Sequence, residues 1–405
     1  MVRVAITGFG AVSAAGIGAE ALWQAARDGV SGVRPLDMPR SETLRVRIAA
    51  GVPEFDAAAL LGGSVPRTSE RFSQFAMVAA AEAVAQSGIT AEQLAGRRSA
   101  TIIGTGVGGV GTIDDNCYLF YSEQHSGVRG EAMSVPRVMP SSAVSHVSIA
   151  HGITGPSFGI VSACASGAQS IGVAMQMIRS GMVDRALAGG TEACITPVTM
   201  RGWEMLRVLS PRACQPFSAD RTGMVLGEGA AVFLLESEES AHARGATVLA
   251  WLDGYGTSSD ARDMIQPDAE GAATAMREAL ADAGVTPGQI GYVNAHGTGT
   301  VLNDVNEAAA LRAVFGEAIQ SVPVSSSKPI LGHTLGAAGA LELVVAVQAL
   351  RHQMVPPQVN LTRPDPKCAL NLPTGAAQPA DLDAVLSNSF AFGGINAVLL
   401  VRRAP

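Results

Sequence analysis

The chain has 405 residues, of which 47% are hydrophobic and 16% are charged, and its formal net charge is −7. Such a chain can bury a large core in two or three domains or in two packed halves, and its acidic balance argues against a nucleic-acid binder that neutralises phosphates. No apolar run reaches the roughly 18 residues that a membrane-spanning helix needs, so we expect no membrane span.

The five cysteines are scattered, and none stands in a CxxC pair. Because their number is odd and their spacing irregular, the sequence predicts neither a disulfide framework nor a zinc site. The first residues read as a strand followed by a glycine turn rather than as a signal peptide. We therefore expect a cytoplasmic protein in a reducing compartment.

Short strand-like runs alternate with helical patterns along the chain. Strands are predicted at 2–7, 99–104, 158–163, 185–188, 230–235, 248–254, 291–294, 322–325, 384–387 and 397–401. Helices are predicted at 19–27, 70–86, 167–180, 272–283, 303–315 and 335–350. This alternation predicts an α/β protein with largely parallel sheets.

The two halves of the chain are organised alike. Cys164 follows a strand and opens a helix in the first half, and His296 follows a strand and precedes a glycine turn and a helix in the second. No linker or low-complexity tract separates the halves. The expected division is residues 1–250, which carry the cysteine, and residues 251–405, which carry the histidines and a lysine.

The glycine-rich segment 104–111, GTGVGGVG, follows a predicted strand and fits the GxGxxG pattern. A dinucleotide site would need a helix directly after it and an acidic residue at the end of a second strand, and neither stands out. A backbone turn beside a pocket is the better interpretation. The sequence contains no GxxxxGK[ST] phosphate loop.

Cys164 lies in SACASGAQSIG, where a strand turns into a helix. A lone cysteine is more often a small buried hydrophobe than a nucleophile. At this turn, however, its thiol can face the positive end of the helix dipole, which would lower its pKa and favour the thiolate. The small flanking residues would also leave backbone N–H groups free to stabilise an oxyanion.

Three further segments carry groups able to do chemistry. His296 lies in NAHGTGT, and Lys328 precedes His333 by five residues in KPILGH. A lysine in so apolar a segment needs an anionic partner or a depressed pKa. The fourth segment, SNSFAFGGINA at 387–397, reads as a glycine hairpin. Taken alone, each group also has an ordinary structural interpretation.

Taken together, these segments resemble the β-ketoacyl-[acyl-carrier-protein] synthases of the thiolase superfamily. The likeness extends over nearly the whole chain. It includes ITGFGAVSAAG, SACASGAQSIG, DRTGMVLGEGAAVFLLE, NAHGTGT, GHTLGAAGALE and NSFAFGGINA, in the family's order. The resemblance implies a thiolase-like fold, in which two pseudo-repeated halves pack as a five-layer α-β-α-β-α sandwich.

The resemblance also implies the reaction and the catalytic roles. Cys164 would accept an acyl group from a thioester, and a malonyl unit on a carrier protein would lose its carboxylate and condense with that acyl group. His296 and His333, as neutral imidazoles, would stabilise the enolate oxygen, and Lys328 would keep His333 correctly protonated. The N–H groups of Cys164 and Phe392 would form the oxyanion hole, with Phe392 acting as a gate.

Other matching positions imply contacts with substrate, carrier and cation. Thr298 and Thr300 match groups that hydrogen-bond the phosphopantetheine arm. The remaining substrate contacts are Val107, Trp203, Phe390 and Asn396. A basic rim of Arg67, Arg71 and Arg129 would dock the acidic carrier protein. Asn294, Glu342, Ser387 and Asn388 match a cluster that holds a structural monovalent cation in some members. No other cofactor is expected.

Several positions depart from the family pattern. The gating loop reads FAFGGIN, so Ala391 stands in place of a hinge glycine and Ile395 in place of a threonine. Because alanine tolerates positive φ poorly, the gate would be stiffer. Trp203 replaces a smaller residue, and the segments 209–223 and 260–267 also differ. These changes favour a specialised type II fatty-acid, polyketide or polyene pathway over housekeeping elongation.

Alternatives remain open. A non-catalytic chain-length factor would lack the nucleophile, which Cys164 supplies here. A thiolase would carry a second cysteine in FAFGGIN, and a starter-unit synthase would use a Cys-His-Asn set. The chain could also be the active subunit of a heterodimer with a degenerate sister chain. A homodimer and a heterodimer with a related ketosynthase-like subunit are thus both compatible with the sequence.

Overall fold

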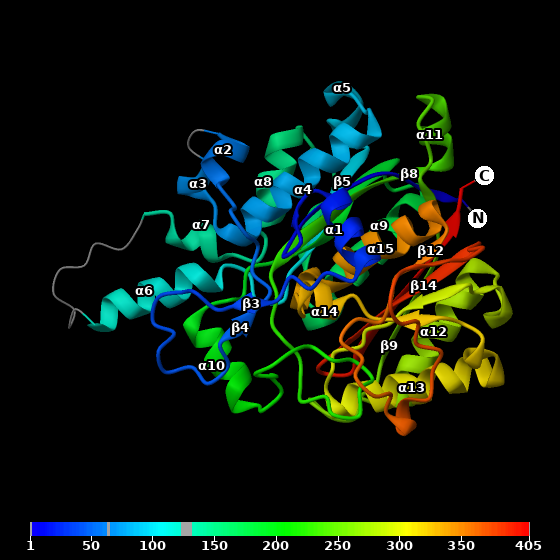
Figure 1. Cartoon of the computed structure of the whole chain (residues 1–405). Helices are drawn as coiled ribbons and strands as arrows, with labels where there is room; N and C mark the ends of the chain where they lie inside the picture. The colour runs from blue at the N-terminus through cyan, green and yellow to red at the C-terminus, as the bar shows by residue number, and fades with distance from the viewer. Residues whose placement is uncertain (1, 63–64, 123–131, 405) are drawn as a thin grey trace.

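One eleven-stranded sheet runs through the part of the chain that the structure, a computed structural model, describes, which is residues 2–62, 65–122 and 132–404 (Figure 1). Its order is β11-β10-β14-β15-β9-β1-β8-β7-β5-β6, and β2 pairs with β1 beside this path. Its strands are β1 (Val4–Ser13), β2 (Gly16–Ile17), β5 (Ser99–Gly104), β6 (Ser157–Ile160), β7 (Arg185–Glu192), β8 (Gly229–Ser237), β9 (Ala250–Ser259), β10 (Tyr292–Asn294), β11 (Val324–Ser325), β14 (Ala384–Ala391) and β15 (Ile395–Arg403).

The helices fall into long ones, of nine or more residues, and short ones, of six or fewer. The long ones are α1 (Ala19–Asp28), α4 (Arg71–Ser87), α6 (Val110–Ser122), α8 (Ser142–His151), α9 (Ser166–Arg179), α10 (Pro197–Met205), α12 (Ala269–Ala283), α13 (Val301–Phe315) and α15 (Ala338–His352). The short ones are α2 (Ala57–Leu61), α3 (Val65–Thr68), α5 (Ala91–Leu94), α7 (Ser134–Val138), α11 (Glu238–Ala243) and α14 (Lys328–Leu331). Two small hairpins, β3 (Arg34–Pro35) with β4 (Ile48–Ala49) and β12 (Met354–Val355) with β13 (Gln378–Pro379), lie apart from the sheet.

Helices cover both faces of the sheet in layers. The central helices α9 and α15 pack against each other and against strands of both halves of the chain. On the outside, α4 packs on β1 and β8, whereas α12 packs on β9 and β15 (Figure 1). Residues 338–350 of α15 are all buried, as a helix enclosed on every side requires. This is the layered thiolase-like arrangement that the family resemblance implied.

The sheet is mixed, and the prediction of largely parallel pairing is wrong in this respect. Parallel pairs join β5 to β6 and β7, and β10 to β11 and β14. The middle of the sheet is antiparallel, through β7–β8–β1–β9–β15–β14. A short connection such as the turn at 392–394 between β14 and β15 leaves no room for the crossover that a parallel pair needs.

The predicted strands and helices all form, with shifted ends. The first strand continues to Ser13 rather than ending at residue 7, and the strand before Cys164 ends at Ile160. Three of the longer helices, α6, α8 and α10, have no counterpart among the predicted ones. In particular, α6 does follow the glycine-rich segment, where the sequence was ambiguous. No helix of the described residues is long and apolar enough to cross a membrane.

Candidate active site

Cys164 lies at a tight turn between β6 and α9, as the sequence predicted. It occupies a short 3₁₀ turn, Ala163–Ala165, directly before the first residue of α9. Ala163 has a φ of 48°, a left-handed conformation that is strained for alanine. The Ser166 hydroxyl holds this turn, because it accepts from the Ser162 N–H at 2.9 Å and donates to the Ala163 carbonyl at 2.7 Å. These two hydrogen bonds hold the turn in its strained conformation.

The surroundings of the Cys164 thiol keep it protonated at rest. Only 6% of the residue is exposed, and burial raises the pKa of the thiol to about 12. The positive charge of Lys328 and a hydrogen bond from the backbone N–H of Phe392 lower the pKa, but by less. The expectation of a lowered thiol pKa at the helix start is therefore not met, because burial, the largest influence on this thiol, raises its pKa.

His296 and His333 are brought together in the interior. Their rings meet edge to face, with centroids 5.2 Å apart, and neither residue is more than 2% exposed. Burial, and next the charge of Lys328, lower the pKa of both imidazoles well below the usual 6.5. Both rings are thus neutral at pH 7, as the family resemblance implied.

Lys328 is wholly buried and contacts His296 rather than His333. Its ammonium lies 3.2 Å from His296 Nδ1, donates to the His296 carbonyl at 2.5 Å and forms an ion pair with Glu342. An ammonium can only donate, so Nδ1 accepts and the proton of the ring lies on Nε2. Lys328 can therefore influence His333 only through its positive charge. Its direct contact instead sets the tautomer of His296.

A cavity of about 260 Å³ opens onto the nucleophile. Its walls contain Cys164, both histidines and the predicted gate residue Phe392. They also contain most of the predicted substrate contacts, namely Thr298, Thr300, Trp203, Phe390 and Asn396. The two threonine hydroxyls lie 2.9 Å apart. Val107 is not among the lining residues: its side chain is 38% exposed, and its N–H donates to Glu192. A single copy of the chain therefore does not bring Val107 to this cavity.

The predicted gate is the turn between β14 and β15. Phe392 stacks on Trp203 with ring centroids 5.7 Å apart and an angle of 30° between the planes. Gly393 and Gly394 carry the positive φ values of the turn, 81° and 68°. Ala391 ends β14 and is not among the residues with positive φ. The substitution of the hinge glycine thus causes no strain in the conformation observed.

The four residues of the possible cation site are buried close together. Asn294 and Ser387 are register partners on β10 and β14, and the Asn294 amide donates to the Glu342 carbonyl at 3.1 Å. Two buried oxygens, Oε2 of Glu342 and Oδ1 of Asn388, lack a hydrogen-bond partner. Unsatisfied oxygens of this kind are what a monovalent cation would bind, so the residues fit the group. Within the described ranges, no cluster of three or more His, Cys, Asp or Glu could hold a metal.

The three arginines of the predicted docking rim are not equivalent. Arg67 is exposed in α3. Arg71 is bound to Glu228 through Nη2 at 2.6 Å, and it lines a separate cavity of about 690 Å³ that contains none of the nucleophile or histidine residues. Arg129 lies outside the described residues. Because Arg71 is already paired with Glu228, the prediction that it docks the carrier protein is weakened.

Two buried carboxylates that organise the site were missed from the sequence. Glu192 accepts hydrogen bonds from the N–H groups of Gly106 and Gly336 at 2.7 and 2.9 Å, and so ties the glycine-rich turn to the segment after His333. Glu307 accepts from the N–H groups of His296 and Gly297, both at 2.8 Å. The signal for Glu192 was an acid that ends an otherwise apolar strand; Glu307 looked like an ordinary helix residue.

Comparison with known families matches nearly the whole chain. Residues 1–241 match the description "Beta-ketoacyl synthase, N-terminal domain", and residues 249–362 match "Beta-ketoacyl synthase, C-terminal domain". The chain is 42% identical to Nodulation protein E of Rhizobium leguminosarum bv. trifolii over 99% of each chain. It is 40% identical to 3-oxoacyl-[acyl-carrier-protein] synthase 2 of Coxiella burnetii, over 99% of this chain and 98% of that one.

Solved structures agree over the full length. The ishigamide ketosynthase/chain length factor superposes with a TM-score of 0.96 at 34% identity, covering 100% of both chains. A β-ketoacyl synthase from Burkholderia phymatum gives a TM-score of 0.92 at 37% identity, again with 100% coverage of both. These similarities extend over both halves of the sheet.

Proposed function

The chain belongs to the β-ketoacyl synthase family, and from this premise we propose that Cys164, His296 and His333 carry out its reaction in a specialised type II pathway. It is a β-ketoacyl-[acyl-carrier-protein] synthase, an acyltransferase that forms carbon–carbon bonds. The observation that supports these residue roles most strongly is that one cavity holds the thiol and both neutral imidazoles.

In the first half-reaction, Cys164 attacks the thioester carbonyl of an acyl chain on the carrier. A sulfur–carbon bond forms, and the carbon–sulfur bond to the phosphopantetheine arm breaks. The proton of the Cys164 thiol passes to the departing thiol of the arm, so no net proton is gained or lost. This suits a thiol whose pKa lies near 12, since no standing thiolate is needed. The N–H groups of Cys164 and Phe392 stabilise the tetrahedral oxyanion.

In the second half-reaction, a malonyl unit takes the place of the first carrier substrate. Its carboxylate leaves as CO₂, and the electron pair of the broken bond moves onto the thioester as an enolate. His296 and His333 donate from Nε2 to the enolate oxygen, which they can do because they are neutral and buried. The enolate carbon attacks the acyl-cysteine, and Cys164 leaves and regains a proton from water.

The buried oxygens of Asn294, Glu342, Ser387 and Asn388 would hold a structural monovalent cation. Such an ion would offset the negative charge of Glu342 and Glu307 behind the histidines. Its contribution would be electrostatic, because none of these four residues lines the cavity that contains Cys164.

The carrier protein would approach at the mouth of the cavity that contains Cys164. Arg207 lines this cavity and is exposed, which makes it a better partner for an acidic carrier than Arg71. Exposed apolar residues line the same cavity, including Val301 at 60%, Leu302 at 53% and Ile265 at 47%. Arg67 remains a candidate for a more distant contact.

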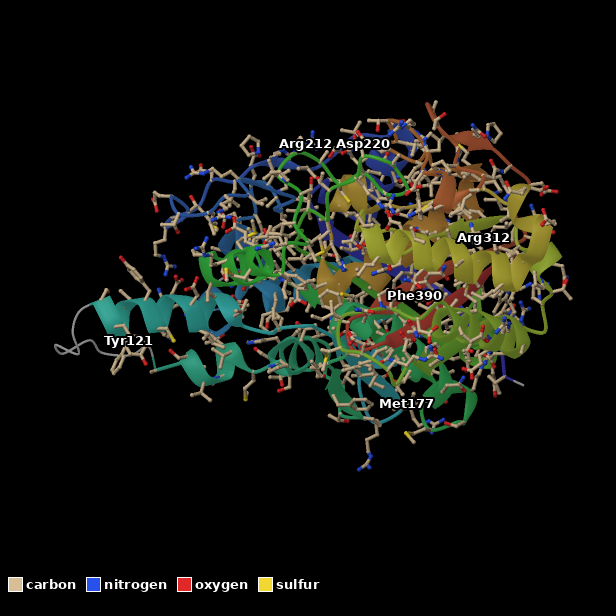
Figure 2. All side chains as sticks on the ribbon, turned by 90° about the horizontal axis from the view of Figure 1, so that it is seen from below. Tyr121, Met177, Arg212, Asp220, Arg312 and Phe390 are labelled. Atoms are coloured by element: carbon tan, nitrogen blue, oxygen red, sulfur yellow. The ribbon has the colours of Figure 1, made fainter. Side chains whose placement is uncertain are left out.

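A second chain of the same fold would cover the free edge of the sheet. β6 ends the sheet order, and Phe158 and Val161 beside it are 41% and 58% exposed. Figure 2 shows α6 reaching away from the body, with Tyr121 near its end, and that residue is 70% exposed. An exposed edge strand and an apolar arm are features that pairing would bury. The solved ketosynthase/chain length factor supports such pairing.

The substitutions near the gate favour a specialised pathway. Trp203 narrows the cavity by stacking on Phe392, and Ala391 and Ile395 alter the turn that would open it. Housekeeping elongation is the alternative.

The proposal is tested by reconstituting the chain with a panel of acyl carriers and malonyl carrier. We expect ketoacyl product and CO₂ from the wild type. We expect the His333→Ala variant to acylate Cys164 normally while losing malonyl decarboxylation by about 100- to 1,000-fold, the effect of removing one oxyanion donor. Decarboxylation by this variant at the wild-type rate would contradict the role of His333. A native mass of one chain would contradict the pairing, and a mass of two identical chains would identify a homodimer.

A further inference from the structure

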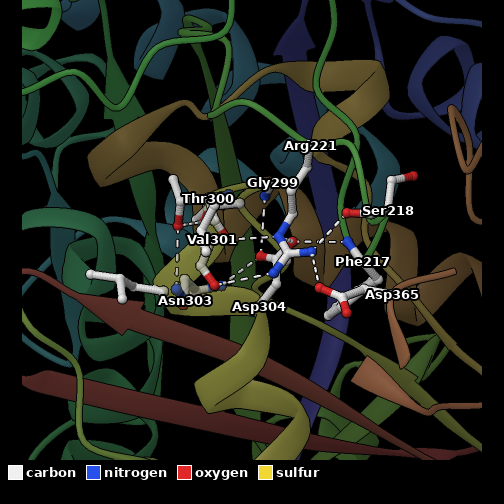
Figure 3. Close-up of polar contacts among 12 residues, drawn as sticks. Phe217, Ser218, Arg221, Gly299, Thr300, Val301, Asn303, Asp304 and Asp365 are labelled. Carbon is white, nitrogen blue, oxygen red and sulfur yellow. Dashed lines mark hydrogen bonds and ion pairs between the residues drawn. The ribbon is translucent and has the colours of Figure 1, made fainter. Parts of the chain in front are cut away.

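A buried arginine holds the turn that carries Thr298 and Thr300. Arg221 belongs to the loop before β8, and only 2% of its side chain is exposed. Figure 3 shows its guanidinium between this loop, the start of α13 and the segment around Asp365. The arginine therefore joins three segments that are far apart in the sequence.

The guanidinium of Arg221 donates most of its hydrogen bonds to main-chain carbonyl oxygens. Nε and Nη2 donate to the carbonyls of Thr300 and Val301, both at 3.1 Å. Nη1 donates to the Ser218 carbonyl and to Asp365 Oδ2, both at 2.7 Å. A planar guanidinium with five donors can reach all these acceptors at once, which the single ammonium of a lysine cannot.

Asp304 completes the arrangement from the other side of the turn. It is fully buried, lies 3.4 Å from Arg221 Nε and accepts from the Phe217 N–H at 2.8 Å. Its second oxygen accepts from the Gly299 N–H at 3.2 Å. The main chain on both sides of Thr300 is thus fixed, by the aspartate at Gly299 and by the arginine at the carbonyls of Thr300 and Val301.

We propose that Arg221, with Asp304, is a positioning residue for recognition of the phosphopantetheine arm. It acts through the main chain, by setting where the hydroxyls of Thr298 and Thr300 enter the cavity. Arg221 does not itself line the cavity; it contacts the main chain of residues that do. This inference rests on the proposed role of the two threonines. Arg221 therefore governs how well a substrate with an arm binds, and not the decarboxylation of a bound one.

The experiment measures CO₂ release from two malonyl thioesters. Malonyl-coenzyme A carries the phosphopantetheine arm, and malonyl methyl thioester lacks it. We expect Arg221→Lys to raise KM for the coenzyme A ester about tenfold, equivalent to about one weakened hydrogen bond, with kcat unchanged. For the methyl thioester we expect KM and kcat within about twofold of wild type. Equal losses on both substrates would overturn the proposal.

A second variant and a matched control keep the test independent of folding. Asp365→Asn removes charge at the outer end of the network, where Asp365 is 15% exposed, and we expect a smaller rise in KM for the coenzyme A ester only. Arg179 is another buried arginine, with 8% of its side chain exposed, and it is paired with Asp282 at 2.7 Å at the far end of α9. Arg179→Lys should not raise KM for the coenzyme A ester relative to the methyl thioester. If this control variant did so, the proposal would be overturned.

The threonines distinguish this inference from the function on which it rests. If a Thr298→Val, Thr300→Val double variant treats both substrates as the wild type does, the proposed arm contact itself fails. If that variant loses affinity for the coenzyme A ester while Arg221→Lys does not, the arm contact stands and the role of Arg221 is refuted.

Discussion

Replacing Lys328 by methionine would separate its structural role from its catalytic one. The residue is fully buried, forms an ion pair with Glu342, which is 1% exposed, and lies 3.2 Å from His296 Nδ1. Removing one partner of a buried ion pair leaves an uncompensated charge and costs about 3–5 kcal/mol. We therefore expect Lys328→Met to lower the free energy of unfolding by that amount, measured by urea denaturation.

The double variant Lys328→Met, Glu342→Gln removes the charge that the single variant strands. A buried pair replaced by groups of similar volume is often close to neutral in stability, so we expect recovery of most of the lost free energy. Malonyl decarboxylation should not recover, because His296 has lost the donor that keeps its proton on Nε2. CO₂ release under saturating malonyl carrier is the assay.

Two results would refute this reasoning. Wild-type decarboxylation in the double variant would mean that Lys328 does not control the tautomer of His296. A stability in the double variant as low as in the single one would mean that the ion pair is not what the lysine contributes. Acylation of Cys164 in each variant provides the control for a folded site.

Other predictions concern the electrostatics and the gate. Because the pKa of His296 and His333 lies well below 6.5, both rings should remain neutral in NMR titration at pH 6, where an ordinary histidine is mostly protonated; a midpoint at or above 6.5 would contradict this. Glu192→Gln places an amide NH₂ among converging N–H donors and should lower the free energy of unfolding by about 1–3 kcal/mol, whereas unchanged denaturation would count against its role. Trp203→Phe should loosen Phe392 and admit longer acyl chains in a competition assay; an unchanged product profile would remove Trp203 as a determinant. Ala391→Gly should speed acyl transfer up to about tenfold if opening needs positive φ there, and an unchanged rate would dismiss the stiff gate.

The parts of the fold that follow from short-range patterns were predictable. Apolar runs bounded by glycine identified the buried strands, and the small residues around Cys164 identified the turn before α9. The family motifs then placed His296, Lys328 and His333 in one site, which the structure does bring together. The mixed pairing of the sheet was not predictable in this way, because strand direction depends on which strands become neighbours.

The residues that were missed act through contacts distant in sequence. Glu192 binds groups near residues 106 and 336, and Arg221 binds groups near residues 300 and 365. A single sequence gives no signal for such pairs. The pKa of Cys164 was misjudged for a related reason, since the helix start is visible in the sequence whereas the depth of burial is not.

The central claim is that Cys164 carries the growing chain. Intact-mass spectrometry of the protein, offered a panel of acyl-carrier thioesters, tests it most directly. We expect the wild type to gain the mass of one acyl group with at least one carrier, and the Cys164→Ala variant to gain none. Acylation of that variant to the same extent, or failure of the wild type with every carrier, would contradict the account.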